Sequence, residues 1–131
     1  MAHQHSPQFL KLVEEAKTRS REIDAPGLLQ KLQRKNEFRL IDVRESEEYA
    51  AGRIPGAQHL CKGIIERDIE TAVPDPNAEI VLYCGGGFRS ALAADNLQKM
   101  GYTRVYSRAG GWRELVQAGL PTEKPGGGSQ E

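Results

Sequence analysis

The residues best suited to chemistry lie in one stretch, where a cysteine is followed by three glycines and an arginine. Cys84 ends the apolar run 80–83, and the residues after it are Gly85, Gly86, Gly87, Phe88, Arg89 and Ser90. Because glycines have no Cβ, such a loop can turn several backbone N–H groups toward one anion. Cysteine is nucleophilic as a thiolate, which is such an anion. The stretch therefore predicts a nucleophilic Cys84 whose own loop stabilises its thiolate.

Positive charge follows the glycines. Arg89 stands five positions after the cysteine, and Ser90 opens an alanine-rich pattern with helical spacing. A helix N-terminus stabilises a nearby anion by about 0.3–1 kcal/mol at an exposed site and by up to about 2 kcal/mol when partly buried. Charge-assisted hydrogen bonds from loop N–H groups each add a comparable amount. Together these contributions are expected to hold Cys84 as a thiolate, and a Cβ at Gly86 or Gly87 is expected to disturb the ring of N–H groups.

The same residues also have a structural interpretation. A free cysteine at the end of a strand is often a small buried hydrophobe, and a run of glycines is often only a flexible loop. The order of strand, cysteine, glycines, arginine, serine and helix favours the catalytic interpretation of Cys84.

The loop lies in a chain where strands and helices alternate. Strands are predicted at 21–24, 38–44, 58–60, 80–83 and 104–107. Helices are predicted at 7–18, 26–36, 46–52, 89–100 and 111–118, with a helical or irregular crossover at 64–69. Ser46 is expected to cap the helix that it begins. The alternation predicts one α/β domain with a mainly parallel sheet, whose ligands bind beyond the carboxyl ends of the strands, where Cys84 lies.

The composition points away from several other classes of protein. The 131 residues are the usual size of one domain, and 18 basic side chains balance 18 acidic ones. No apolar run approaches the roughly 20 residues of a membrane span. The two cysteines, Cys61 and Cys84, resemble neither a disulfide scaffold nor a metal-ligand cluster. We therefore expect a soluble cytoplasmic protein with reduced thiols, no cofactor or metal, and no nucleic-acid or membrane partner.

Several short motifs include or flank the loop. They are LIDVR at 40–44, EY at 48–49, GRIPGA at 52–57, YCGGGFRS at 83–90, GY at 101–102, GG at 110–111 and AGLP at 118–121. Together they resemble the single-domain rhodaneses. The resemblance implies a rhodanese-like three-layer α/β fold, with a mainly parallel five-stranded sheet and helices on both faces. It divides the chain into an N-terminal helical extension at 1–20, a rhodanese-like domain at 21–123 and a disordered tail at 124–131.

The resemblance also implies a sulfurtransferase. Cys84 would accept sulfane sulfur from thiosulfate or a persulfide and pass it, as a Cys84 persulfide, to cyanide or a thiol. The loop at 85–90 would bind the substrate, with Arg89 bracing the loop and Ser90 capping the helix or donating to the sulfur. The implied partners are small-molecule sulfur donors and acceptors or a sulfur-accepting protein, and the chain is expected to be a monomer or a weak homodimer. Gly85 stands where thiosulfate-using members often carry arginine, which leaves the donor open.

Two other functions remain open. The first is a phosphatase or arsenate reductase of a related cysteine-dependent class, whose loop has five residues between cysteine and arginine. The interval from Cys84 to Arg89 contains four, which favours sulfur chemistry. The second is a non-catalytic rhodanese-like module that binds or regulates. Such modules commonly lack the cysteine, which this chain retains.

Asp42 and Arg44 end a strand on the predicted active-site side, and we expect them to support the site. Arg44 is expected to pair with Glu48 rather than to touch substrate. Asp42 is expected to organise the loop rather than to act as an acid or base.

The remaining candidate residues carry weaker signals. Cys61 is interpreted as a packing residue, with a resolving thiol as the alternative, and His59 could face the site. His3 and His5 belong to a polar terminal stretch and are assigned no role.

Overall fold

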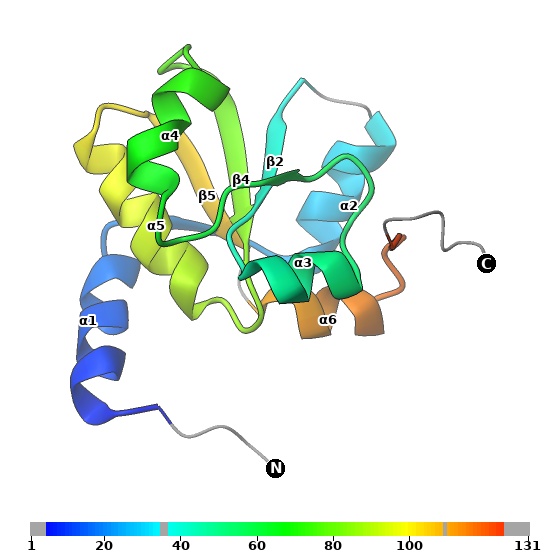
Figure 1. Cartoon of the computed structure of the whole chain (residues 1–131), viewed down its shortest axis with the longest axis horizontal. Coiled ribbons are helices and arrows are strands. Elements are labelled where there is room, and N and C mark those ends of the chain that lie inside the picture. The colour runs from blue at the N-terminus through cyan, green and yellow to red at the C-terminus, as the bar shows by residue number, and fades with distance from the viewer. Residues whose placement is uncertain (1–4, 35–36, 109, 125–131) are drawn as a thin grey trace.

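A parallel sheet of five strands forms the centre of the part of the chain that the computed structural model describes, residues 5–34, 37–108 and 110–124. The strands are β1 (Arg21–Ile23), β2 (Arg39–Asp42), β3 (Gln58–His59), β4 (Glu79–Tyr83) and β5 (Arg104–Arg108). Their order across the sheet is β1-β5-β4-β2-β3, and every pair of neighbours is parallel (Figure 1). The predicted α/β architecture is confirmed, and the strand predicted at 21–24 lies at a sheet edge.

Strand β4 lies in the middle of the sheet, as its apolar sequence predicts. All five of its residues are buried, and it pairs with β2 on one side and β5 on the other. Its side chains alternate between two cores: Ile80 and Leu82 belong to one, and Val81 and Tyr83 to the other. Because all strands run the same way, their carboxyl ends meet at one edge of the sheet. Cys84 is the first residue beyond β4 at that edge.

Helices cover both faces of the sheet (Figure 1). They are α1 (Pro7–Lys17), α2 (Ala25–Arg34), α3 (Ser46–Ala51), α4 (Ile65–Ala72), α5 (Phe88–Lys99) and α6 (Gly111–Gln117). Helices α4 and α5 contribute Ile65 and Leu97 to one core, while α2 and α6 contribute Leu28 and Leu115 to the other. The result is a three-layer arrangement with the sheet between the two groups of helices.

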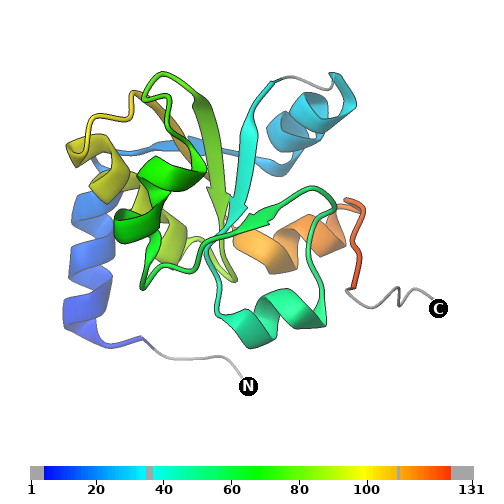
Figure 2. The same cartoon turned by 45° about the horizontal axis from the view of Figure 1, so that its top comes forward.

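Helix α1 packs against α5 (Figures 1 and 2). It begins with a capping bond in which Phe9 N donates to Ser6 Oγ at 3.4 Å. Val13 and Ala16 are the buried residues of this helix. Beyond its end, Arg19 donates two hydrogen bonds of 2.9 Å to the carboxylate of Asp95 on α5. Apolar contact and an ion pair therefore hold the N-terminal segment to the domain.

Local hydrogen bonds explain where the predicted boundaries are wrong. The strand predicted at 38–44 ends at Asp42, because Asp42 Oδ1 accepts the backbone N–H of Arg44 at 2.9 Å and turns the chain. Ser46 is the first residue of α3 and not its cap; Glu45 holds the N-cap position and donates its N–H to Glu48 Oε1 at 2.9 Å. The crossover predicted at 64–69 is helix α4. The predicted helix end at 36 and the tail beyond 124 lie outside the described residues.

Candidate active site

Cys84 lies at the junction of β4 and α5, where two backbone N–H groups point at its sulfur. Gly87 N and Ser90 N donate to Cys84 Sγ at 3.1 and 3.4 Å, and the cysteine is only 1% exposed. Ser90 is the third residue of α5, and the N-cap, Gly87, has no side chain that could accept its N–H. The sulfur therefore takes the place of a capping oxygen at the positive end of the helix dipole. The two N–H donors and the helix dipole stabilise negative charge at the sulfur position.

The three glycines differ in what they contribute. Within the described chain, Gly87 is the one glycine of the three that donates to the sulfur and the one with a positive φ, of 94°. A Cβ on Gly85 would lie 2.9 Å from Arg89 Nη2, whereas a Cβ on Gly86 would have no atom within 4 Å. The expectation that a side chain at Gly86 would disturb the N–H groups is therefore wrong. Gly87 is the position whose backbone needs glycine.

A short chain of hydroxyl groups continues from the sulfur into the protein. Cys84 Sγ lies 3.6 Å from Ser90 Oγ, which lies 2.8 Å from Ser107 Oγ on β5. Both serines are fully buried. The thiol can donate to Ser90, and the Ser90 hydroxyl can donate to the thiolate, so that Ser90 serves either form of the sulfur. Sequence reasoning missed Ser107, whose one signal was a serine within the strand predicted at 104–107.

Arg89 is bound to a carboxylate from α3. Its guanidinium donates to Glu48 Oε1 and Oε2 at 2.8 and 3.1 Å, a bidentate pair. These hydrogen bonds lower the pKa of Glu48 below its usual range. The expected pairing of Glu48 with Arg44 is therefore wrong, because Glu48 faces the loop. The pair ties α3 to the start of α5 and fixes the far end of the cysteine loop.

Arg44 pairs with Asp42 instead, and both side chains are buried. Arg44 Nη2 donates to Asp42 Oδ2 at 2.7 Å and to the carbonyl oxygen of Gly52 at 2.6 Å. Its guanidinium lies 4.4 Å from the ring centroid of Trp112 on α6. Neither Asp42 nor Arg44 lines the cavity at Cys84. The pair joins the end of β2 to the end of α3 and to α6.

The start of α6 lies directly on the backbone of the cysteine loop. Trp112 N donates to the carbonyl oxygen of Cys84 at 2.6 Å. Gly111 has a φ of 61°, and a Cβ there would lie 2.5 Å from the Cys84 carbonyl oxygen and 2.6 Å from the carbonyl carbon of Gly85. Only a residue without a side chain allows this approach. The motif at 110–111 indicated this position in the sequence, but its role was not predicted.

A cavity of about 550 Å³ opens at the sulfur. Its lining comes from the loop, from α3 and α6, and from the N-terminal segment: His5, Phe9, Glu48, Cys84, Gly85, Gly86, Phe88, Arg89 and Arg113. Gly87 and Ser90 are absent from the lining and act behind it, through their N–H groups. His5, to which no role was assigned, lies in the lining with its ring centroid 4.7 Å from that of Phe88. His3 lies outside the described residues.

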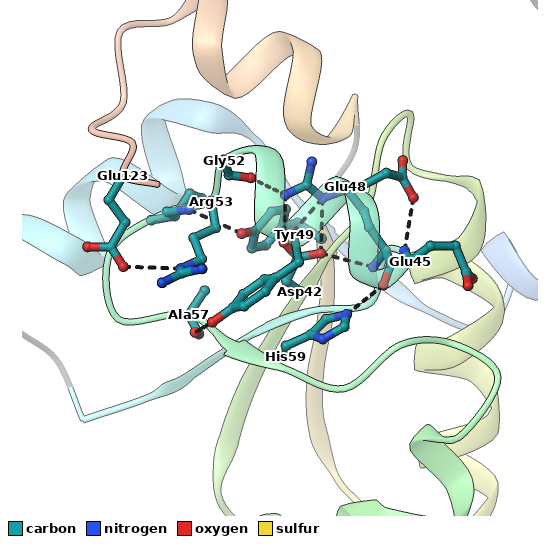
Figure 3. A network of polar contacts seen from close by, with 12 residues as sticks. Asp42, Glu45, Glu48, Tyr49, Gly52, Arg53, Ala57, His59 and Glu123 are labelled. Atoms are coloured by element: carbon teal, nitrogen blue, oxygen red, sulfur yellow. Dashed lines mark hydrogen bonds and ion pairs between the residues drawn. The ribbon is translucent and has the colours of Figure 1, made fainter. Parts of the chain in front are cut away.

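His59 and Cys61 lie apart from this cavity. His59 stacks on Tyr49 with ring centroids 4.5 Å apart, and its Nε2 is 2.8 Å from the carbonyl oxygen of Arg44 (Figure 3). Cys61 is half-buried, and both cysteines are free. In the described ranges no set of three or more His, Cys, Asp or Glu side chains is grouped to hold a metal ion. None of the helices described here has the length and apolarity needed to cross a membrane.

Comparison with known proteins identifies the family. Residues 25–118 match the rhodanese-like domain, and the chain belongs to that family. It is 39% identical over 76 residues to the thiosulfate sulfurtransferase PspE of Escherichia coli, covering 58% of this chain and 72% of that protein. It is 35% identical over 106 residues to a sulfurtransferase of Allochromatium vinosum, covering 81% and 97%. A Rhodopseudomonas palustris protein of unknown function, described as a possible tyrosine phosphatase, superposes with a TM-score of 0.81 at 27% identity, over 94% of this chain and 99% of that one.

Proposed function

We propose that this chain is a rhodanese-type sulfurtransferase in which Cys84 carries sulfane sulfur as a persulfide. The observation that carries the proposal is the position of Cys84 Sγ, which accepts two backbone N–H groups at a helix N-terminus and lines an open cavity. Sulfurtransferases of Escherichia coli and Allochromatium vinosum, at 39% and 35% identity, support the same reaction class.

The first half-reaction loads Cys84. Its thiolate attacks the outer sulfur of a donor such as thiosulfate, and a bond forms between Sγ and that sulfur. The sulfur–sulfur bond of the donor breaks, and sulfite leaves with the electron pair. Cys84 then carries a persulfide anion, whose negative charge is stabilised by the same helix N-terminus that holds the thiolate.

The second half-reaction transfers the terminal sulfur from the Cys84 persulfide to an acceptor. The lone pair of an acceptor, cyanide or a thiolate, attacks the terminal sulfur of the persulfide. The bond from that sulfur to Cys84 Sγ breaks, and Sγ keeps the electron pair and returns to the thiolate. Cyanide becomes thiocyanate, and a thiol becomes a persulfide. A sulfur-accepting protein could present the same thiol at the mouth of the cavity.

The loop residues divide the work between them. The N–H groups of Gly87 and Ser90 donate to the charged sulfur, and the Ser90 hydroxyl can donate to it or accept from it. Gly85, Gly86 and Phe88 line the cavity and bind the substrate. Arg89 braces the loop through Glu48. Asp42 and Arg44 support the loop from behind.

Intact-mass measurement tests the proposal. The protein is incubated with thiosulfate or with glutathione persulfide and desalted, and its intact mass is measured. A gain of one sulfur atom is expected in the parent and in the matched control Cys61→Ser, is absent in Cys84→Ala, and is removed by cyanide. No gain with either donor would rule out the sulfurtransferase.

A phosphatase is the second candidate, because the Rhodopseudomonas palustris neighbour is described as a possible tyrosine phosphatase. Two observations weigh against it. The loop has four residues between Cys84 and Arg89, and the Arg89 guanidinium is already bound by Glu48. A phosphatase predicts Cys84-dependent hydrolysis of an aryl phosphate; we expect none.

The cellular setting is part of the same proposal. Two free cysteines suit a reducing compartment, and we propose the cytoplasm. We also propose that the chain acts as a monomer or weak homodimer.

A further inference from the structure

Aromatic rings from the N-terminal segment form one wall of the Cys84 cavity. The centroid of the Phe88 ring lies 4.7 Å from that of His5 and 6.1 Å from that of Phe9, both in edge-on geometry. His5 and Phe9 are themselves 5.2 Å apart. Lys17 lies over the Phe88 ring with its Nζ 5.3 Å from the centroid. We call His5, Phe9 and Phe88 the aromatic wall.

The segment that carries His5 and Phe9 is anchored by contacts outside the catalytic loop. Val13 and Ala16 are buried on α1, and the pair of Arg19 with Asp95 fixes the end of the segment to α5. Residues 5–17 precede the part of the chain that matches the rhodanese-like domain, which begins at residue 25. Two of the three rings therefore come from outside the matched domain and reach its active site.

The charges around the cavity select for an anion of a particular kind. Glu48 and Arg89 compensate each other. Arg113 has no ion-pair partner among the described residues and remains as an uncompensated cation at the cavity. Arg113 beside the aromatic wall suits a ligand with a carboxylate and an organic body. Thiosulfate, a small dianion without apolar groups, gains nothing from aromatic surface.

The size of the cavity agrees with such a ligand. A volume of about 550 Å³ lies within the range of roughly 300–1,000 Å³ that small organic ligands occupy in proteins. Thiosulfate would leave most of it to water.

We infer that the aromatic wall is a specificity element, which makes the preferred sulfur donor a carboxylate-bearing organic persulfide rather than thiosulfate. This inference rests on the proposed sulfurtransferase function. The organic body packs on Phe9 and Phe88, the carboxylate pairs with Arg113, and the sulfane sulfur reaches Cys84. The Cys84 thiolate attacks the outer sulfur of R–S–SH, the donor sulfur–sulfur bond breaks, and R–S⁻ leaves with the electron pair, so that Cys84 carries S–SH.

Truncation of the wall tests the inference. Phe9→Ala removes one ring, while the buried Val13 and Ala16 still anchor the helix. Leu12→Ala is the matched control, because Leu12 is 54% exposed on the same helix and absent from the cavity lining. The readout is the second-order rate of Cys84 loading by glutathione persulfide divided by the rate with thiosulfate. We expect this ratio to fall about tenfold in Phe9→Ala, a typical loss for apolar contact in a binding pocket, and to stay at the parent value in Leu12→Ala.

A ratio in Phe9→Ala within about twofold of the parent would overturn the inference, and so would an equal fall in the control. A second variant, His5→Ala, removes an exposed ring with little effect on folding and is expected to lower the ratio in the same direction. If His5→Ala and Phe9→Ala both keep the parent ratio, the wall has no role in donor choice.

A binding measurement separates this inference from the proposed function. S-methylglutathione has the organic body and the carboxylates but no sulfane sulfur. Calorimetric titration is expected to show binding to the parent and to Leu12→Ala, weakened about tenfold in Phe9→Ala. That result supports the wall even if Cys84 never takes up sulfur, in which case the proposed function fails alone. No binding to the parent, or equal binding to Phe9→Ala, overturns the wall.

Discussion

A single methyl group at Gly87 is expected to slow the chemistry of Cys84. Gly87 has a φ of 94°, where an alanine costs about 1–2 kcal/mol. In the parent, Gly87 N lies 3.1 Å from Cys84 Sγ. We expect the variant to relieve the strain by rotating the Gly87 peptide, which moves this N–H away from the sulfur. A hydrogen bond to a charged group contributes about 1.5–3 kcal/mol, and about 1.36 kcal/mol corresponds to a factor of ten. Loss of this hydrogen bond is therefore expected to slow the reaction of the Cys84 sulfur with an electrophile about ten- to a hundredfold.

The rate of iodoacetamide alkylation at neutral pH measures this reactivity. Gly87→Ala is compared with Gly86→Ala, both in a Cys61→Ser background so that one thiol is followed. Gly86 is the matched control, because a Cβ there meets no atom within 4 Å. We expect the Gly86 variant to react at the parent rate and the Gly87 variant at least about tenfold more slowly. Equal rates in the two variants would refute the claim that the Gly87 N–H activates the sulfur.

Two further predictions concern the supports of the loop. Gly111→Ala places a Cβ 2.5 Å from the Cys84 carbonyl oxygen at a φ of 61°, so we expect urea melts to show a loss of at least about 1–3 kcal/mol, and parent stability would refute the close approach. Glu48→Gln weakens the ion pair with Arg89. The Arg89 and Glu48 side chains are 31% and 39% exposed, so the loss in unfolding free energy should stay below about 1 kcal/mol. Because the folded-state pKa of Glu48 is lowered, its contribution is present at neutral pH and is lost as the pH falls through that lowered pKa. Unfolding free energies of parent and Glu48→Gln should differ at neutral pH and converge as the pH falls through the lowered pKa of Glu48; a difference that does not change with pH would contradict this.

The central part of the fold could be predicted because its signals are local. The run 80–83 is apolar at every position, which is typical of a strand covered on both faces, and β4 lies in that place. The cysteine, glycines and alanine-rich helix follow one another directly, so their junction could be located without knowing the rest of the chain. The hydrogen bonds from Gly87 and Ser90 to the sulfur follow from that junction.

The partners of charged residues could not be predicted in the same way. Glu48 and Arg44 are close in the sequence and opposite in charge, which favoured a pair between them. The structure instead ends the strand at Asp42, which takes both the backbone N–H and the guanidinium of Arg44. Glu48 is then free to reach Arg89, 41 residues later in the chain. The choice depends on where β2 stops, which a single local hydrogen bond decides.

Residues that reach the site only through the packing of helices and strands were harder still to predict from the sequence. His5 belongs to a polar stretch and reaches the cavity only because α1 lies along α5. Ser107 reaches Ser90 because β5 is the parallel neighbour of β4. All three glycines of the loop are equally permissive, so the sequence alone does not distinguish Gly87, whose φ is positive, from Gly86.

The motifs on which the family resemblance rests contact one another around the loop that holds the Cys84 sulfur. The Asp-Val-Arg segment supplies Arg44, which binds the carbonyl oxygen of Gly52 and so holds the end of α3. From α3, Glu48 binds Arg89 at the far end of the cysteine loop. The glycine pair brings Gly111 against the backbone of Cys84 from the other side. A thiolate needs N–H groups at fixed positions, so segments distant in sequence are constrained together by the geometry around Cys84.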